Sequence, residues 1–183
     1  CRQKCLDCPY YTVTIGRNMS SVSFQERYVK ALINEIKSRA DQFVNRKIDT
    51  INFGGGTPSL LEPHQFERIM AAITEINSEA KLAKEISIEA TPESVVYDKF
   101  KSFQESGLNR VSIGIESFYD NETKALRRHN STEDSYVAVE TLQMLKMKNI
   151  CTDLMYAVRE QTIETWHESL KAVIKLDRKS TRL

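Results

Sequence analysis

Apolar residues recur at helical spacing between Phe24 and about Phe43, with charged residues between them. The members of this apolar set are Tyr28, Val29, Leu32, Ile33, Ile36 and Ala40. This period predicts an amphipathic helix. The run from Ile48 to Phe53 is instead rich in β-branched and aromatic residues and ends abruptly at Gly54, which predicts a short strand.

The same alternation of helical and strand patterns continues along the chain. Further helices are predicted from Pro63 to about Ile76, over about 93–106 and from 162 to about 176. A broken helical region is predicted to begin at 121, to resume after 131 and to end at about 148. Further strands are predicted over 85–90, 110–115 and 150–156. Strands that alternate with helices predict a parallel sheet with the helices packed outside it, so the expected fold class is α/β.

Polar and glycine residues stand where each predicted strand ends. Gly54–Gly56 follow the first strand, Glu89 ends the second, Glu116 follows the third and Asp153 lies on the fourth. In β/α barrels the chemistry lies at the carboxyl ends of the strands. A glycine-rich turn alone is more often a plain loop, but packing does not explain four such positions at one rim.

Composition narrows the classes of partner. The 183 residues are expected to form one domain, 1–183, with a sizeable core. The 26 Lys and Arg nearly balance the 25 Asp and Glu, so a net charge of +1 gives no general attraction to nucleic acid or to an anionic membrane. No apolar run approaches the ~20 residues that span a bilayer, and nothing resembles a signal peptide. We therefore expect no nucleic-acid partner and no membrane span.

Three of the four cysteines lie within eight residues, as Cys1-x3-Cys5-x2-Cys8. An odd set cannot pair into disulfides without leaving one over, and so tight a loop suits thiolate ligands of a metal centre. Zinc usually takes four protein ligands, but the nearest others in the sequence are His64 and Cys151. A [4Fe-4S] cluster also normally takes four cysteines, so three would leave one iron open to a substrate or cofactor. Zinc or a reactive thiol group remains the alternative, and clustered free cysteines favour a reducing, cytoplasmic location.

Five motifs then follow one another along the chain. They are Cys1-x3-Cys5-x2-Cys8, Phe53-Gly-Gly-Gly-Thr-Pro-Ser59, Ile88-Glu-Ala-Thr-Pro92, Asn109-Arg-Val-Ser-Ile-Gly-Ile-Glu-Ser-Phe118 and Asp153-Leu-Met-Tyr156. Their order, content and intervals, from Cys1 to about Leu170, resemble the radical S-adenosylmethionine (SAM) branch that contains oxygen-independent coproporphyrinogen III oxidase and its haem chaperone-like relatives. The resemblance implies a radical SAM core with a partial (β/α)6 barrel. We expect this core to be truncated at both ends. The strand before the first cysteine and at least one strand after Leu176 are expected to be missing.

The resemblance also implies a role for each matching residue. Cys1, Cys5 and Cys8 would ligate a [4Fe-4S] cluster whose open iron is chelated by the amino and carboxylate groups of SAM. The SAM-binding residues would be Asp7, Gly55, Gly56, Thr57, Glu89, Glu116, Arg128 and Asp153. Among them, Arg128 would form an ion pair with the SAM carboxylate, and Asp153 would form a hydrogen bond with the ribose or the amino group of SAM. A structural ion pair between Glu89 and a lysine is the simpler alternative for that carboxylate.

The implied activity is the reductive cleavage of SAM to a 5′-deoxyadenosyl radical, which abstracts hydrogen from a substrate. The implied partners are a one-electron donor of the flavodoxin or ferredoxin type and a tetrapyrrole or other small-molecule substrate. No catalytic residue is assigned beyond the cluster. The alternatives are a radical methyltransferase, a haem chaperone on the same fold that binds and transfers haem, and a zinc-binding or inactive barrel fragment.

Three positions and one turn depart from the pattern of this branch. Tyr10 stands where the oxidase proper has a further cysteine, which favours the chaperone-like relatives or the methyltransferases. Glu116 replaces the usual glutamine, so an acceptor-only carboxylate takes the place of an amide if it is ionised. Asp7 replaces an aromatic residue, and Tyr156-Ala-Val-Arg-Glu160 replaces a turn that contains two glycines and a proline.

Overall fold

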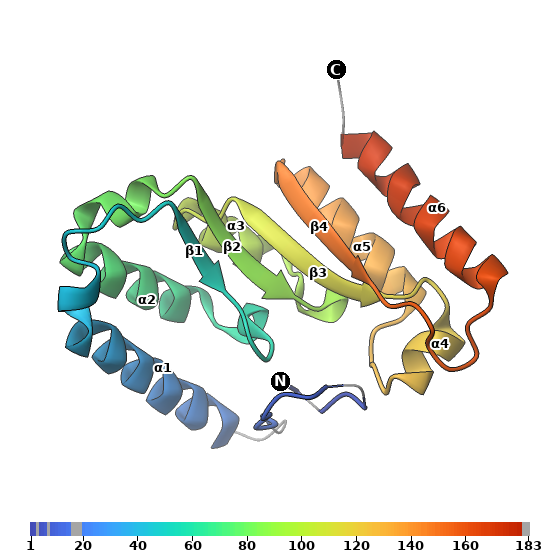
Figure 1. The fold of residues 1–183 in the computed structure, drawn as a ribbon, viewed down its shortest axis with the longest axis horizontal. Helices are drawn as coiled ribbons and strands as arrows, with labels where there is room; N and C mark the ends of the chain where they lie inside the picture. The colour runs from blue at the N-terminus through green and yellow to red at the C-terminus, as the bar shows by residue number, and fades with distance from the viewer. Residues whose placement is uncertain (3, 7, 16–19, 181–183) are drawn as a thin grey trace.

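A computed structural model describes the chain except for residues 3, 7, 16–19 and 181–183 (Figure 1). Its four strands form one sheet in the order β1-β2-β3-β4, and each strand runs parallel to its neighbours. The strands are β1 (Thr50–Phe53), β2 (Glu85–Ala90), β3 (Arg110–Glu116) and β4 (Asn149–Leu154). The predicted α/β class and parallel sheet are therefore confirmed.

Helices connect the successive strands and flank the sheet (Figure 1). They are α1 (Ser20–Ser38), α2 (Pro63–Ile76), α3 (Tyr97–Glu105), the short α4 (Asp120–Ala125), α5 (Thr132–Met144) and α6 (Ile163–Ser180). None of the helices in the described part of the chain is long and apolar enough to cross a membrane.

The helix predicted over about 93–106 begins later than expected. Pro92–Ser94 instead form a single 3-10 turn, and Val95 and Val96 are extended before α3 begins at Tyr97. Two adjacent β-branched residues are poor helix formers, and Val95 is buried in the core. The first helix also differs, because α1 ends at Ser38 and a separate 3-10 turn covers Ala40–Gln42.

The two faces of the sheet differ in polarity because side chains alternate along each strand. On β2, Ile86, Ile88 and Ala90 are buried in the core beneath the helices. The residues between them, Ser87 and Glu89, lie on the opposite face. The helices therefore cover an apolar face and leave a polar one.

Aromatic residues fill the core between α2, α3 and β1. Phe66 lies between Phe53 and Phe103, with ring centroids 4.5 and 4.7 Å away, and Phe100 is 5.4 Å from Phe103. Phe66, Phe100 and Phe103 are fully buried. This packing fixes the helices against the sheet and so holds the carboxyl ends of the strands in place.

Candidate cofactor site

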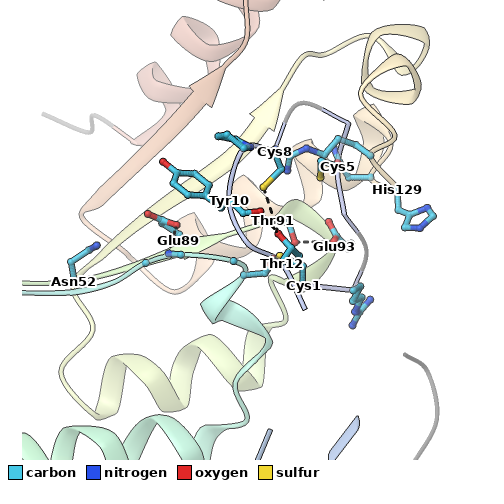
Figure 2. Close-up of a pocket in the computed structure, with 18 residues that line it drawn as sticks. Cys1, Cys5, Cys8, Tyr10, Thr12, Asn52, Glu89, Thr91, Glu93 and His129 are labelled. Carbon is cyan, nitrogen blue, oxygen red and sulfur yellow. Dashed lines mark hydrogen bonds between the residues drawn. The ribbon is translucent and has the colours of Figure 1, made fainter. Parts of the chain in front are cut away.

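A cavity of about 670 Å³ lies at the carboxyl ends of the first two strands (Figure 2). Its walls come from the cysteine loop, the glycine turn after β1, the end of β2 and the segment after α4. The sequence-predicted residues that line it are Cys1, Cys5, Cys8, Gly55, Gly56, Thr57, Glu89 and Arg128. The parallel sheet brings them together because all its strands end at the same edge.

The three cysteines of the loop are half-buried and free of disulfides. The hydroxyl of Thr57 donates a hydrogen bond to Cys1 Sγ at 3.2 Å, and Cys8 Sγ lies 3.7 Å from Thr12 Oγ1. Within the described residues, no three Cys, His, Asp or Glu side chains are grouped as the ligands of one metal ion. The sulfur atoms instead lie around the wall of a shared cavity (Figure 2).

Backbone contacts attach the cysteine loop to the rest of the molecule. The amide of Leu6 donates to the carbonyl of Leu126, at the end of α4, over 3.2 Å. The amide of Ile15 donates to the carbonyl of Cys1 at 2.8 Å. The loop is therefore held at one side by α4 and closed on itself at the other.

The glycine turn is shaped by two features that exclude side chains. Gly55 and Gly56 have φ angles of +78° and +67°, a region that glycine adopts without strain. A Cβ on Gly54 would lie 2.8 Å from both Asn52 Nδ2 and Glu89 Oε1, which is too close for either contact. The amide of Gly55 donates to Glu89 Oε2 at 3.0 Å. The turn thus presents bare backbone to the cavity and fixes the Glu89 carboxylate against it.

Lys99 on α3 contacts the 3-10 turn Pro58–Leu60, which follows the glycine turn. Its Nζ donates to the carbonyl of Ser59 at 3.0 Å. Partial burial lowers the pKa of Lys99, and the carboxylate of Glu62 and the guanidinium of Arg2 act on it in opposite directions. This bond ties the turn after β1 to the helix that follows β2.

Arg128 lines the cavity and forms an ion pair with Glu116. Glu116 is the last residue of β3, where a bulge interrupts the register with β4 and φ is +67°. A Cβ on Gly114 would lie 2.8 Å from Glu116 Oε1, so the glycine leaves room for the pair. Glu116 is not itself among the lining residues and reaches the cavity through Arg128.

The remaining predicted residues lie elsewhere. Asp153 is on β4, outside the cavity lining, and its Oδ2 accepts a hydrogen bond from Ser112 Oγ at 2.9 Å. Asp7 lies outside the described residues. Cys151 is half-buried on β4 and apart from the cysteine loop. The Glu89 carboxylate accepts a hydrogen bond from the Gly55 amide, and no lysine is seen to pair with it in the described part of the chain.

Sequence reasoning missed several polar residues of the lining, which are Arg2, Thr12, Asn52, Thr91, Glu93, His129 and Asn130. Thr91 Oγ1 donates to Glu93 Oε1 at 2.8 Å. Asn52 accepts from Ser87 Oγ at 2.8 Å across the polar face of the sheet. Strand alternation could have indicated Asn52, and the position of Thr91 and Glu93 directly after β2 could have placed both at the same rim.

Three polar atoms of this lining are buried without a hydrogen-bond partner in the described chain. They are Glu93 Oε2, Arg128 Nε and Asn130 Nδ2. Buried polar groups are almost always paired, so unpaired ones in a cavity wall indicate a ligand or water. Together with thiols and a glycine-lined cradle, this donor and acceptor set fits an iron–sulfur cluster and a polar co-substrate such as SAM.

The sequence matches one family model and proteins of known name. The family model described as the radical SAM superfamily matches residues 1–173. The haem chaperone HemW of Synechocystis sp. is 32% identical over 171 residues, which are 93% of this chain and 41% of the relative. The oxygen-independent coproporphyrinogen III oxidase of Bradyrhizobium diazoefficiens is 29% identical over 177 residues, which are 96% of this chain and 38% of the relative.

A solved structure of another protein is also similar to this chain. The coproporphyrinogen III oxidase of Escherichia coli, described as a radical SAM enzyme, matches with a TM-score of 0.80 and 28% identity. The match covers 96% of this chain and 39% of that protein. The chain therefore spans about two-fifths of the length of these relatives.

Proposed function

Because the chain belongs to the radical SAM superfamily, we propose that it binds a [4Fe-4S] cluster and SAM in the cavity at the carboxyl end of the sheet and cleaves SAM reductively. One observation carries this proposal. Cys1, Cys5 and Cys8 line the same cavity as the glycine turn and Glu89, although these segments are far apart in the sequence.

The cysteine loop would hold the cluster with three thiolates, which leaves one iron for the co-substrate. When bound, such a cluster supplies the electron that breaks a carbon–sulfur bond of SAM. The hydroxyl of Thr57, 3.2 Å from Cys1 Sγ, would donate to the thiolate and stabilise its charge. The bare backbone of Gly55 and Gly56 would let SAM approach the main chain closely.

The charged residues would orient SAM. We assign Arg128 to the SAM carboxylate, because a guanidinium binds a carboxylate through charge-assisted hydrogen bonds. Glu89, held by the Gly55 amide, would accept from SAM, and Asp153 would accept from its ribose or amino group. Glu116 would act through Arg128, and Asp7 would contact the adenine through its main chain.

The substrate and partners rest on the relatives. The names of two similar proteins, a haem chaperone and a coproporphyrinogen III oxidase, support a role in tetrapyrrole or haem metabolism. The proposed reductive cleavage would also need an external one-electron donor. A second candidate is haem binding and transfer without oxidase activity. Tyr10 favours it, because this residue lines the cavity where the oxidase pattern has a further cysteine.

The proposal is tested by anaerobic reconstitution with iron and sulfide. The expected result is about four irons per chain and a reduced-state electron paramagnetic resonance signal that shifts when SAM is added. Cys5→Ala should lose the cluster, whereas Cys151→Ala is the matched control and should keep it, because Cys151 lies outside the loop. A protein that takes up zinc instead, or a signal that ignores SAM, would contradict the proposal.

A second measurement separates the two candidate functions. Dithionite-reduced protein that releases 5′-deoxyadenosine from SAM supports reductive cleavage. Stoichiometric haem binding without release of 5′-deoxyadenosine supports the chaperone. Replacement of Tyr10 by cysteine tests the residue that favours the chaperone, since it restores the thiol of the oxidase pattern.

A further inference from the structure

A fully buried carboxyl group on α4 has no role in the assignments above. The side chain of Glu122 is 0% exposed, and its Oε2 accepts hydrogen bonds from Ser117 Oγ at 2.7 Å and from Gln161 Nε2 at 2.9 Å. Its Oε1 has no hydrogen-bond partner among the residues that the structure describes. Glu122 also lies outside the lining of the cofactor cavity. Burial of a carboxyl group with incomplete hydrogen bonding costs free energy, so we asked what its two bonds hold in place.

The two bonds attach α4 to the carboxyl ends of two strands. Ser117 directly follows β3, and Gln161 lies in the segment that leads from β4 to α6. The Nε2 atom of Gln161 also donates to the carbonyl of Met155 at 3.1 Å, which fixes this side chain to the end of β4. Figure 1 shows α4 beside the same segment. Because α4 has only six residues, its intrinsic stability is low and its position depends on such contacts.

The last turn of α4 holds the cysteine loop. The amide of Leu126 donates to the carbonyl of Glu122 at 3.2 Å, and the carbonyl of Leu126 accepts from the amide of Leu6, also at 3.2 Å. Leu6 lies between Cys5 and Cys8 in the sequence. Its side chain is 63% exposed, so the backbone bond and not side-chain burial attaches this part of the loop. A path of contacts therefore leads from the Glu122 carboxyl group, through the end of α4, to the loop.

We propose that Glu122 is a positioning residue for the cysteine loop. Its carboxyl group fixes α4 to the ends of β3 and β4, and α4 in turn fixes the loop backbone between Cys5 and Cys8. This inference rests on the proposed function, in which these cysteines ligate the cluster, and adds a residue that does not line the cavity. A contact that served only general stability would act on the whole fold and would not act selectively on the loop.

The test measures hydrogen exchange of the Leu6 amide in the metal-free protein by nuclear magnetic resonance. This amide exchanges when its bond to Leu126 opens. Glu122→Leu should raise its exchange rate about tenfold, since loss of a buried hydrogen-bonded group lets α4 move away more often. The amide of Phe66, on α2, is the internal reference and should stay within about twofold. Glu122→Gln keeps an oxygen that accepts both bonds and should also leave Leu6 within about twofold of wild type.

Two further variants separate positioning from general stability. Gln161→Leu removes one of the two bonds at a half-buried position, so it should also raise the Leu6 exchange rate severalfold and remains informative if Glu122→Leu does not fold. Asn77→Leu is the matched control. It removes a buried amide that donates to two backbone carbonyls at the C-terminal end of α2. It should lower global stability and leave the Leu6 rate within about twofold.

The reconstituted protein supplies a second readout. Glu122→Leu should lose its cluster to an iron chelator severalfold faster than the wild type, whereas Glu122→Gln and Asn77→Leu should not. Unchanged Leu6 exchange in Glu122→Leu and Gln161→Leu, or an equal rise in Asn77→Leu, overturns the inference. If the wild type takes up no cluster, the proposed function fails, while the exchange rates of the metal-free protein still decide whether Glu122 holds the loop.

Discussion

Arg128 and Glu116 form an ion pair at the cavity wall, and the missing side chain of Gly114 provides the space for it. The two side chains are only 17% and 11% exposed, so each charge depends on the other. Glu116 also occupies a left-handed backbone conformation with φ of +67° after a bulge in β3. The end of β3 therefore positions a cation beside the site and partly neutralises it.

Loss of this ion pair should destabilise the protein, and the loss should be larger when Arg128 is left without any acceptor at position 116. Glu116→Ala should lower the free energy of unfolding by about 3 kcal/mol, because Arg128 remains buried without its counter-ion. Glu116→Gln should cost about 1 kcal/mol, because the amide oxygen still accepts from the guanidinium. Urea denaturation measures both values. Equal stability of the three proteins would mean that Arg128 finds solvent when Glu116 is removed.

The same Glu116→Gln variant should bind SAM more tightly. Removal of the carboxylate leaves Arg128 with an uncompensated positive charge for the ligand carboxylate. The gain should be severalfold at low ionic strength and should shrink as salt is added. Titration at two salt concentrations checks this. Weaker binding would indicate that Glu116 contacts SAM directly.

The glycine turn offers a matched pair of substitutions. Gly54→Ala should weaken SAM binding, because its Cβ would lie 2.8 Å from Glu89 Oε1 and displace that carboxylate. Gly55→Ala meets no atom within 4 Å but places alanine at a φ of +78°. It should therefore cost about 1–2 kcal/mol of stability through backbone strain. Thermal unfolding and SAM titration of both variants separate contact from strain.

The hydrogen bond from Thr57 to Cys1 should tune the cluster. Hydrogen bonds to ligating sulfurs raise the reduction potential, because they stabilise the added negative charge. Thr57→Val removes the hydroxyl that lies 3.2 Å from Cys1 Sγ and should shift the potential to more negative values. Thr57→Ser keeps the hydroxyl and serves as control. Redox titration followed by electron paramagnetic resonance measures the shift. Identical potentials in the wild type and Thr57→Val would show that the hydroxyl does not bond the cysteine sulfur in the cluster-bound protein.

The Glu26 carboxylate should stabilise the folded protein at neutral pH and lose this contribution in acid. Hydrogen bonds from Gln65, Arg68 and His64 lower the pKa of Glu26 to about 2 from an ordinary value of 4.5. A carboxyl whose folded pKa is depressed contributes fully above its unfolded pKa and loses that contribution as pH falls. Glu26→Gln should therefore be less stable than wild type at pH 7, and the difference should disappear between about pH 4.5 and 2. A difference that persists at pH 2 would rule out this linkage.

The aromatic core should be the most sensitive packing site. Phe103 is fully buried, and its ring lies 4.7 Å from that of Phe66. Phe103→Ala should cost about 3–5 kcal/mol, because it removes apolar contacts and leaves a cavity. Phe103→Leu keeps most of the volume and should cost less. Denaturant unfolding gives both values, and a similar cost for the two would point to the ring geometry and not to the volume.

The sequence alone determined the order of strands and helices, the thiol loop and the glycine turn. These features are local, because periodicity, cysteine spacing and turn chemistry act over a few residues. The rule that parallel strands end at one edge was then enough to place the glycine turn near Glu89. The family resemblance assigned a role to Arg128 but gave no indication that Glu116 holds it.

The tertiary structure decided the contacts that depend on register and burial. The bulge in β3 turns Glu116 toward Arg128, and a bulge depends on how neighbouring strands pair. The helix α3 starts at Tyr97, after the β-branched pair Val95 and Val96, and the burial of Val95 in the core became visible only in the folded chain. Asn130 was recognised as a residue of the cavity wall only in the folded molecule. A cavity wall is built from residues that are far apart in the sequence, so it exists only after folding.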